Sequence, residues 1–388
     1  MKHLLTLILV LVAAAFVAPA NAAPLSGTKT IGPTGDYASI GAAIADVQAK
    51  TLGGALVLEL QPAYVSTVET FPLTFTNLTT TAANTLTLRP QAGATALIIA
   101  SADTTAATVD LNGAQFVTLD GRPGGAGTAK QLTIANTSTS TTAVALRFIN
   151  EASSNTVEYL TLQGVNASAV RGTVVFSTTT GPNGNDSNTI DHCDIGDGAT
   201  TPTNAIWSLG TATTTAQNNS GNTVSNCNIF NFYSATFAPK GVDIESGNTD
   251  WIITGNSFYQ TASRAAQAVL VDPINLNVPA GNNFTVSGNF IGGSAPGAGG
   301  TPWTTTGTNA NHSFSGIYLN VGTTTPSSIQ GNTIRNMVWT SNRLAAGISG
   351  VWMGIYVQAG SMNIGTTTGN TIGSGTGTGS IFVTTSGS

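Results

Sequence analysis

The sequence has 388 residues, of which only 7% are charged, and its formal net charge is −5. Its 12 Lys and Arg residues are scattered and form no basic patch that neutralises nucleic-acid phosphates, so nucleic-acid binding is excluded. Hydrophobic residues make up 41% of the chain while the net charge is low. This balance excludes an intrinsically disordered chain and predicts a folded protein with a large core.

Residues 1–22 have the order of a secretory signal peptide. Lys2 and His3 precede an apolar run over residues 4–17, and Ala20-Asn21-Ala22 supplies a small-x-small cleavage site. The run is shorter than the ~20 apolar residues that a spanning helix needs, and no later stretch reaches that length. We therefore expect no membrane span and a mature protein over residues 23–388, secreted to the extracellular space or the cell surface.

The next segment predicts a short helix followed by a strand. Within residues 37–47 the apolar residues recur at helical spacing, at Ile40, Ile44 and Val47. Asp36 or Ser39 is available to cap the start of the helix. Residues 55–60 then form a short apolar strand. A helix at this place would cover the open edge of a stack of strands.

From about residue 154 the chain repeats itself. Six segments align without gaps: 155–162, 188–195, 222–229, 253–258, 286–291 and 329–334. One column of the alignment holds Leu160, Cys193, Cys227, Asn256, Asn289, Asn332 and Asn370. An apolar column lies two residues further on, as a strand with one buried face requires. Units of this kind, with strands and turns but no helical pattern, predict a solenoid of parallel strands.

The alignment also predicts a turn and a ladder of amides. The position before the column is held by residue types that tolerate a left-handed backbone: Gly255, Gly288, Gly331 and Gly369, with Asn226 and His192. A tight turn is expected there. Stacked one strand spacing apart, the amides that follow can hydrogen-bond along the axis of the solenoid. The predicted structural ladder consists of Asn256, Asn289, Asn332 and Asn370.

Residues 30–40 with their helix, the strand over 54–60 and the repeated Gly-Asn-x-Ile/Phe turns resemble the pectate-lyase-like group of β-helix proteins, in the form common among secreted surface proteins of the Bacteroidetes type. The resemblance implies an all-β fold, a right-handed parallel β-helix (solenoid) with a short N-terminal capping helix. It covers nearly the whole mature chain, and its motifs specify a fold and hardly any chemistry.

The chain departs from this group in two ways. Pro62-Ala63-Tyr64 stands where a Gly usually precedes the Tyr, and the sorting domain that often ends such proteins is missing. Residues 381–388 read as a strand with no capping segment after it. We therefore expect a domain that is incomplete at its C-terminus, and a monomer or a part of a larger chain.

Charged groups offer one candidate site. Glu158 and Asp191 occupy consecutive positions of one outward column, with Asp194 nearby, and their oxygens suit a low-affinity calcium site. The alternative is a solvated acidic patch, with no cofactor at all. The basic residues share no column that gathers them: Lys130, Arg147, Arg171, Lys240, Arg264, Arg335 and Arg343. We therefore assign no catalytic residue.

Two cysteines share the ladder column in neighbouring coils. A disulfide is one outcome for Cys193 and Cys227 in an exported chain. Direct neighbours on parallel strands have poorly directed Cβ vectors, which favours free buried thiols. His192 occupies the turn column, where a backbone role accounts for it.

Aromatic residues in variable loops are a further candidate site. Trp303 lies in a long insertion, and Trp339 and Trp352 lie in the next one. Exposed on a rigid scaffold, such rings would bind carbohydrate by stacking on sugars. The alternative is that each Trp covers the side of its coil.

These observations favour a non-catalytic adhesion or carbohydrate-binding module that takes a polysaccharide or a cell-surface glycan. The alternative is a polysaccharide lyase or a glycoside hydrolase of the pectin-lyase-like fold. Gathered acidic and basic residues on one strand face would favour the enzyme.

Overall fold

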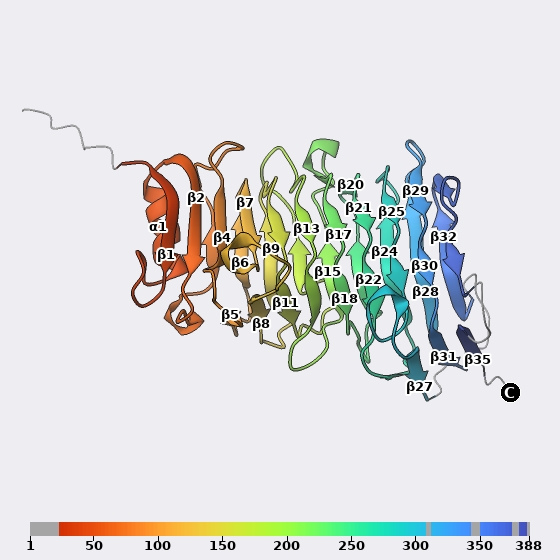
Figure 1. The fold of residues 1–388 in the computed structure, drawn as a ribbon. Coiled ribbons are helices and arrows are strands. Elements are labelled where there is room, and N and C mark those ends of the chain that lie inside the picture. The colour runs from red at the N-terminus through yellow and green to blue at the C-terminus, as the bar shows by residue number, and fades with distance from the viewer. Residues whose placement is uncertain (1–22, 308–311, 343–349, 375–379, 386–388) are drawn as a thin grey trace, which may run out of the picture.

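The computed structural model describes residues 23–307, 312–342, 350–374 and 380–385. The chain winds into stacked coils whose strands run parallel to their neighbours, and long sheets follow the stack from end to end (Figure 1). The protein is a parallel β-helix with one α-helix near its N-terminus, which confirms the predicted fold. Over the described residues, no helix has the length and apolar character to cross a membrane. The predicted signal peptide lies outside the described residues.

Three sheets, called A, B and C, form the sides of the stack. Sheet A contains β1 (Leu25–Ile31), β2 (Leu52–Leu60), β4 (Leu86–Pro90), β7 (Val117–Asp120), β10 (Thr156–Glu158), β13 (Thr189–Asp191), β17 (Thr223–Ser225), β21 (Ile252–Thr254), β25 (Thr285–Ser287), β29 (Ser327–Gln330) and β33 (Met362–Ile364). Sheet B contains β3 (Leu73–Phe75), β6 (Ala107–Asn112), β9 (Val144–Ile149), β12 (Val174–Phe176), β15 (Asn204–Ser208), β19 (Lys240–Ile244), β24 (Leu270–Val278), β28 (Ser313–Val321) and β32 (Trp352–Ala359). Sheet C contains β5 (Leu97–Ser101), β8 (Leu132–Asn136), β11 (Thr161–Gly164), β14 (Asp194–Asp197), β18 (Asn228–Phe230), β22 (Ser257–Tyr259), β26 (Phe290–Ile291), β30 (Thr333–Ile334) and β34 (Thr371–Ile372).

Shorter elements lie between these sheets. A fourth sheet, called D, contains β23 (Arg264–Ala265), β27 (Trp303–Thr306), β31 (Met337–Ser341) and β35 (Ile381–Thr385). One further pair consists of β16 (Asn219–Ser220) and β20 (Asn248–Thr249). The 3-10 turns are η1 (Ser66–Val68), η2 (Pro123–Gly125), η3 (Thr215–Gln217) and η4 (Pro296–Ala298).

The helix α1 (Ile40–Ala49) lies at the N-terminal end of the stack, beside β1 and β2 (Figure 1). Its N-cap is Ser39, whose hydroxyl accepts a hydrogen bond from the amide of Ala42. The Glu69 carboxylate accepts hydrogen bonds from the first two helical amides, those of Ile40 and Gly41, at 2.6 and 3.0 Å. Anionic oxygens at this end also suit the helix dipole. The apolar face of α1 is buried, so the helix covers the first coil as predicted.

The predicted turn joins sheet A to sheet C. Its backbone is left-handed at His192, Asn226, Gly255, Gly288 and Gly331, with φ between 52° and 68°. Gly369, which is among the described residues, does not have this left-handed conformation. The strands before the turn bury one apolar side chain in each coil, at Val157, Ile190, Val224, Ile253, Val286 and Ile329. In-register parallel pairing therefore places like residues above one another.

The amide column is hydrogen-bonded in series. The Nδ2 of Asn256 donates to Oδ1 of Asn289 at 3.1 Å, Asn289 donates to Asn332 at 2.9 Å, and Asn332 donates to Asn370 at 2.9 Å. Each Oδ1 also accepts the backbone amide of the preceding coil, as in the 3.0 Å bond from Asn256. A second series, Asn155 to Asn188 to Asn222, follows the start of the sheet A strands.

Cys193 and Cys227 extend the first amide column toward the N-terminus. Both are free and buried, and the backbone amide of Cys193 donates to Sγ of Cys227 at 3.4 Å. Burial raises the pKa of the Cys227 thiol well above its ordinary value. The expectation of free buried thiols is thus confirmed. Sγ of Cys227 takes the place of an amide oxygen as the acceptor for the preceding coil.

We predict that Asn289→Leu lowers the free energy of unfolding by about 2–5 kcal/mol. Leucine fits a core, but it leaves the amide groups of Asn256 and Asn332 buried without their partner. Asn363→Leu, on the exposed face of β33, serves as the matched control and is expected to change stability little. Urea unfolding of the two variants and the parent measures the effect, and equal stability of all three would show that the ladder contributes nothing.

Candidate functional site

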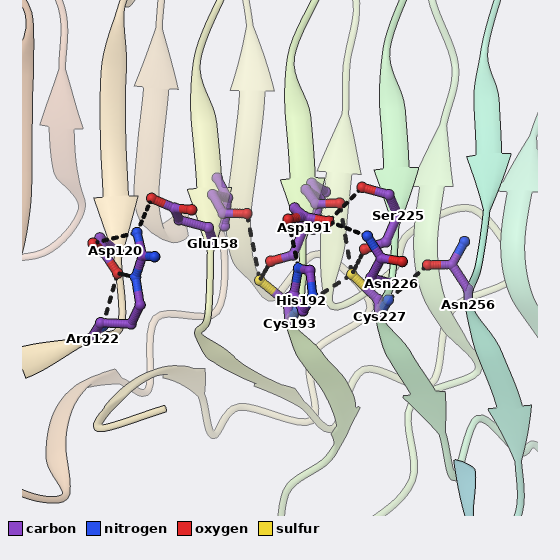
Figure 2. A network of polar contacts seen from close by, with 12 residues as sticks. Asp120, Arg122, Glu158, Asp191, His192, Cys193, Ser225, Asn226, Cys227 and Asn256 are labelled. Carbon is purple, nitrogen blue, oxygen red and sulfur yellow. Dashed lines mark hydrogen bonds and ion pairs between the residues drawn. The ribbon is translucent and has the colours of Figure 1, made fainter. Parts of the chain in front are cut away.

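Two of the three carboxylates predicted from the sequence, Glu158 and Asp191, lie in a row with Asp120 on the outer face of sheet A. Asp120, Glu158 and Asp191 are register partners on β7, β10 and β13 (Figure 2). The guanidinium of Arg122 donates to Asp120 at 2.9 Å and to Glu158 at 2.6 Å. Burial raises the pKa of Glu158 and the negative charge of Asp120 adds to this, while the charge of Arg122 opposes it.

Asp191 is held by donors from its own coil and the next. The hydroxyl of Ser225 donates to it at 2.6 Å, Nδ2 of Asn226 donates at 2.9 Å, and Nδ1 of His192 lies 2.6 Å away (Figure 2). Burial alone would raise the pKa of Asp191, but these hydrogen bonds outweigh it and lower the pKa. Each carboxylate of this row therefore already has protein partners.

The predicted calcium site is not assembled. Asp194 lies on β14 in sheet C, where Nζ of Lys130 donates to it at 2.5 Å and Nδ2 of Asn228 at 2.7 Å. Its strand follows the turn, so its side chain belongs to a different face from Glu158 and Asp191. Throughout the described ranges, no group of three or more acidic, His or Cys side chains is placed to hold a metal ion. The expectation that Glu158, Asp191 and Asp194 act together is therefore wrong.

Two of the three predicted sugar-stacking tryptophans, Trp303 and Trp339, are also wrong. Trp303 and Trp339 are only 2% and 0% exposed, and both belong to the main core. The insertions that carry them form β27 and β31 of sheet D, which turn these rings inward. Trp352 is half-buried and stacks on Phe314, with ring centroids 5.5 Å apart. The buried rings of Trp303 and Trp339 therefore leave no face for a sugar, and sugar binding by Trp352 stays a prediction.

A second group of charges lies on the outer face of sheet B. Nζ of Lys240 is 3.0 Å from Oδ2 of Asp243 and 3.5 Å from Oε1 of Glu245. Amides of the next strand donate to both acids: Asn275 to Asp243 at 2.7 Å and Asn277 to Glu245 at 3.1 Å. The Asp243 side chain is 1% exposed, whereas that of Glu245 is 24% exposed. Glu245 is therefore the carboxyl of this group that solvent reaches.

Asp272 adds a third carboxyl beside Lys240. The two residues are register partners on β24 and β19, and Asp272 is 3% exposed. Burial raises the pKa of Asp272 to about 8, with Asp243 adding to the shift and Lys240 opposing it. Burial likewise raises the pKa of Glu245 to about 7, again reinforced by Asp243 and opposed by Lys240. Strong shifts caused by burial and specific charges are typical of functional sites.

Aromatic and amide side chains continue this group along the stack. Register pairing across sheet B joins Trp207, Asp243, Asn275, Tyr318 and Tyr356 in one outward row. The rings of Tyr318 and Tyr356 are half-buried, with centroids 5.4 Å apart. Trp207 is covered by the guanidinium of Arg171, which lies 5.3 Å from its ring. The carboxyls therefore lie between aromatic residues on both sides.

Only part of this charged group on sheet B could be predicted from the sequence. The sequence did not predict the pairing of Lys240 with Asp243, nor that of Arg147 with Asp110 at 2.7 Å. The aligned repeats belong to sheets A and C, so the strands of sheet B were never placed in register. Strand pairing also omits Gly241 and Pro273, so simple alternation does not place Lys240 on the face of Asp243. The spacing of two residues between Asp243 and Glu245 does predict, from the sequence alone, that both lie on one face of a strand.

No family model matches this chain, and no curated protein matches it. Among solved structures, it is similar to the catalytic domain of a GH87 alpha-1,3-glucanase in complex with tetrasaccharides. The identity is 13% and the TM-score 0.32, over 93% of this chain and 70% of that one. A second structure of such a domain has 14% identity and a TM-score of 0.26, over 90% of this chain and 60% of that one. Values this low carry no inference about chemistry, and the fold rests on the strand pairing described above.

We predict that the protein loses stability as the pH rises from ~4 to about 8. Glu245 and Asp272 have a pKa near ~4 when unfolded but of about 7 and about 8 when folded, so the stability they contribute is complete below pH ~4 and is lost as the pH rises through the folded values. Burial lowers the pKa of His312 to about 4. This group therefore makes stability rise with pH, but only below its ordinary pKa of 6.5. Thermal unfolding of the parent and of Asp272→Asn measures the slope. The variant should show a flatter pH profile, and identical profiles would contradict the assignment.

Proposed function

We propose that this protein hydrolyses glycosidic bonds of a polysaccharide on the outer face of sheet B, with Glu245 as the general acid. One observation carries the proposal: Glu245 is a solvent-reachable carboxyl whose pKa is raised to about 7, next to a buried acid that is paired with Lys240. Acid catalysis of glycoside hydrolysis needs a carboxyl that is still protonated near neutral pH. This assignment departs from the non-catalytic function that the sequence favoured.

The proton of Glu245 is held by its surroundings. Burial and the charge of Asp243 favour the neutral form, while the ammonium of Lys240 keeps the shift moderate. A pKa near the working pH is what efficient proton donation requires. In the proposed step Glu245 protonates the glycosidic oxygen as its bond to the sugar carbon breaks. Water then adds to that carbon and gives a proton to the Glu245 carboxylate, which restores the acid.

Asp243 is buried next to Glu245 and acts on the reaction through its charge. Its oxygens accept hydrogen bonds from Lys240 and Asn275. Its side chain is almost inaccessible, so it touches no substrate. A negative charge fixed in a buried place favours the positive charge that develops on the sugar ring in the transition state. Asp243 is therefore a positioning and charge-setting residue in this proposal.

A non-catalytic glycan-binding module is the second candidate. The row of Tyr318 and Tyr356, beside the bonded amides of Asn277 and Asn320, favours it, because rings and amides bind sugars without any chemistry. For either function we propose that the protein acts outside the cytoplasm, on the basis of the signal-like residues 1–22.

We predict that Glu245→Gln lowers the rate of sugar release about 100-fold or more, the usual effect of removing a general acid. Reducing ends released from pectin, alginate, β-glucans and alpha-1,3-glucan by the parent and the variant measure the rate. The parent's activity should also fall as the pH rises through about 7, since Glu245 must be protonated.

Glu158→Gln is the matched control, because it alters a carboxyl of the saturated row on sheet A and should leave the rate unchanged. If the parent binds a glycan but releases no sugar, the binding module is the correct function. Equal loss of activity in both variants would point to the fold and not to Glu245.

A further inference from the structure

Two amides of sheet B form a hydrogen-bonded series that ends at Glu245. Nδ2 of Asn277 donates to Oε2 of Glu245 at 3.1 Å, and Nδ2 of Asn320 donates to Oδ1 of Asn277 at 2.9 Å. The strand pairing of β19, β24 and β28 places the three residues in one outward row. Beyond Asn320 the row continues with Ala359, whose methyl group makes no hydrogen bond. The series therefore runs in one direction, from Asn320 to the carboxyl.

The second amide decides which end of the Asn277 amide faces the carboxyl. If this amide turned over, it would present Oδ1 to Glu245, and an oxygen of this kind cannot donate a hydrogen bond. The donor of Asn320 holds Oδ1 on its own side, which leaves Nδ2 for Oε2 of Glu245. Burial restrains Asn277 less than Asn275, since Asn277 is half-buried and Asn275 is only 4% exposed. The contact with Asn320 therefore supplies a restraint beyond that of packing.

We propose that Asn320 is a positioning residue for the acid of the proposed reaction, because through Asn277 it holds the Glu245 carboxyl in one orientation at the surface of sheet B. The inference rests on the proposed function in taking Glu245 as that acid. All three side chains are partly exposed to solvent, and Asn320 touches no reacting atom in this role. Hydrogen bonds to a charged carboxylate are stronger than those between neutral groups, so a fixed donor also makes ionisation of Glu245 easier.

Breaking the series should make Glu245 harder to ionise. Burial and then the charge of Asp243 raise the pKa of Glu245 to about 7. The ammonium of Lys240 opposes this rise, and so does the hydrogen bond from Asn277. On the β15 side the neighbour is Leu209, which carries no charge. The hydrogen bond from Asn277 is thus the one of these effects that depends on the second amide. The titratable groups around Glu245 that stay unaltered when the series is broken are Lys240 and Asp243 on β19, Asp272 on β24 and Tyr318 on β28.

Carbon-13 NMR of the full chain, labelled at the glutamate carboxyl carbons, measures the titration of Glu245 without requiring any sugar release. The sequence has five Glu residues, and the signal that Glu245→Gln lacks belongs to Glu245. In Asn320→Leu the midpoint of this titration should rise by roughly half to one pH unit, the effect of losing one hydrogen bond. Asn277→Leu should raise it at least as much. Asn320→Gln keeps a donor at this place and should titrate as the parent does.

Asn228→Leu is the matched control, because Asn228 also donates to a carboxylate of the preceding coil, that of Asp194, but on sheet C. It should leave the midpoint of Glu245 unchanged. Asn320 is half-buried on the outer face, so its variants are expected to fold with an unchanged Tm. Asn320→Ala is a second variant without the donor, and it should give the same rise as Asn320→Leu.

An unchanged midpoint of Glu245 in both Asn320→Leu and Asn320→Ala would overturn the positioning role. An equal rise in Asn228→Leu would do the same, because it would trace the shift to the fold as a whole. If the parent releases sugar, the fall of its rate above neutral pH should move upward with the midpoint in Asn320→Leu. If the parent releases none, the proposed acid is wrong, while the titration still decides whether Asn320 holds the carboxyl.

Discussion

In-register parallel pairing is the constraint on which this structure depends. It places equivalent residues of successive coils ~4.8 Å apart, so each position of a coil meets its own counterpart above and below. Inside the stack, only apolar side chains or groups that can bond to themselves satisfy this. Amides meet the second requirement, because each carries a donor and an acceptor. The bonded series through Asn256, Asn289 and Asn332 is the result.

Outside the stack the same constraint brings like charges together. On sheet A, Arg122 lies between Asp120 and Glu158 and neutralises their repulsion, and neutral donors hold Asp191. On sheet B, three carboxyls share one ammonium, that of Lys240. Burial then makes protonation the cheaper way to remove the surplus charge. The two faces therefore differ in charge: on sheet A the carboxylates are paired with donors, whereas burial raises the pKa of Glu245 and Asp272 on sheet B to about 7 and about 8.

Lengthened coils add structure without adding exposed aromatic faces. The insertions before β28 and β32 contribute β27 and β31 to sheet D, and the rings of Trp303 and Trp339 close the core beneath it. The rings of Trp303 and Trp339 are thereby removed from recognition, and the half-buried rings in line with the charges of sheet B are those of Tyr318 and Tyr356. Both proposals consequently rest on the face of a rigid sheet, where side-chain positions are set by strand pairing.

The sequence by itself determined the solenoid, the turn and the amide column, because these follow from periodicity: a period of two along each strand and a recurrence at each coil. It also determined the N-terminal helix, whose apolar spacing is local. Only the tertiary structure decided which charges meet. Lys240 and Asp272 are 32 residues apart and come together through a register that skips Gly241 and Pro273. Asp194, three residues after Asp191, is carried to another face by a single left-handed turn. Contacts across coils depend on loop lengths and turns that no local pattern encodes.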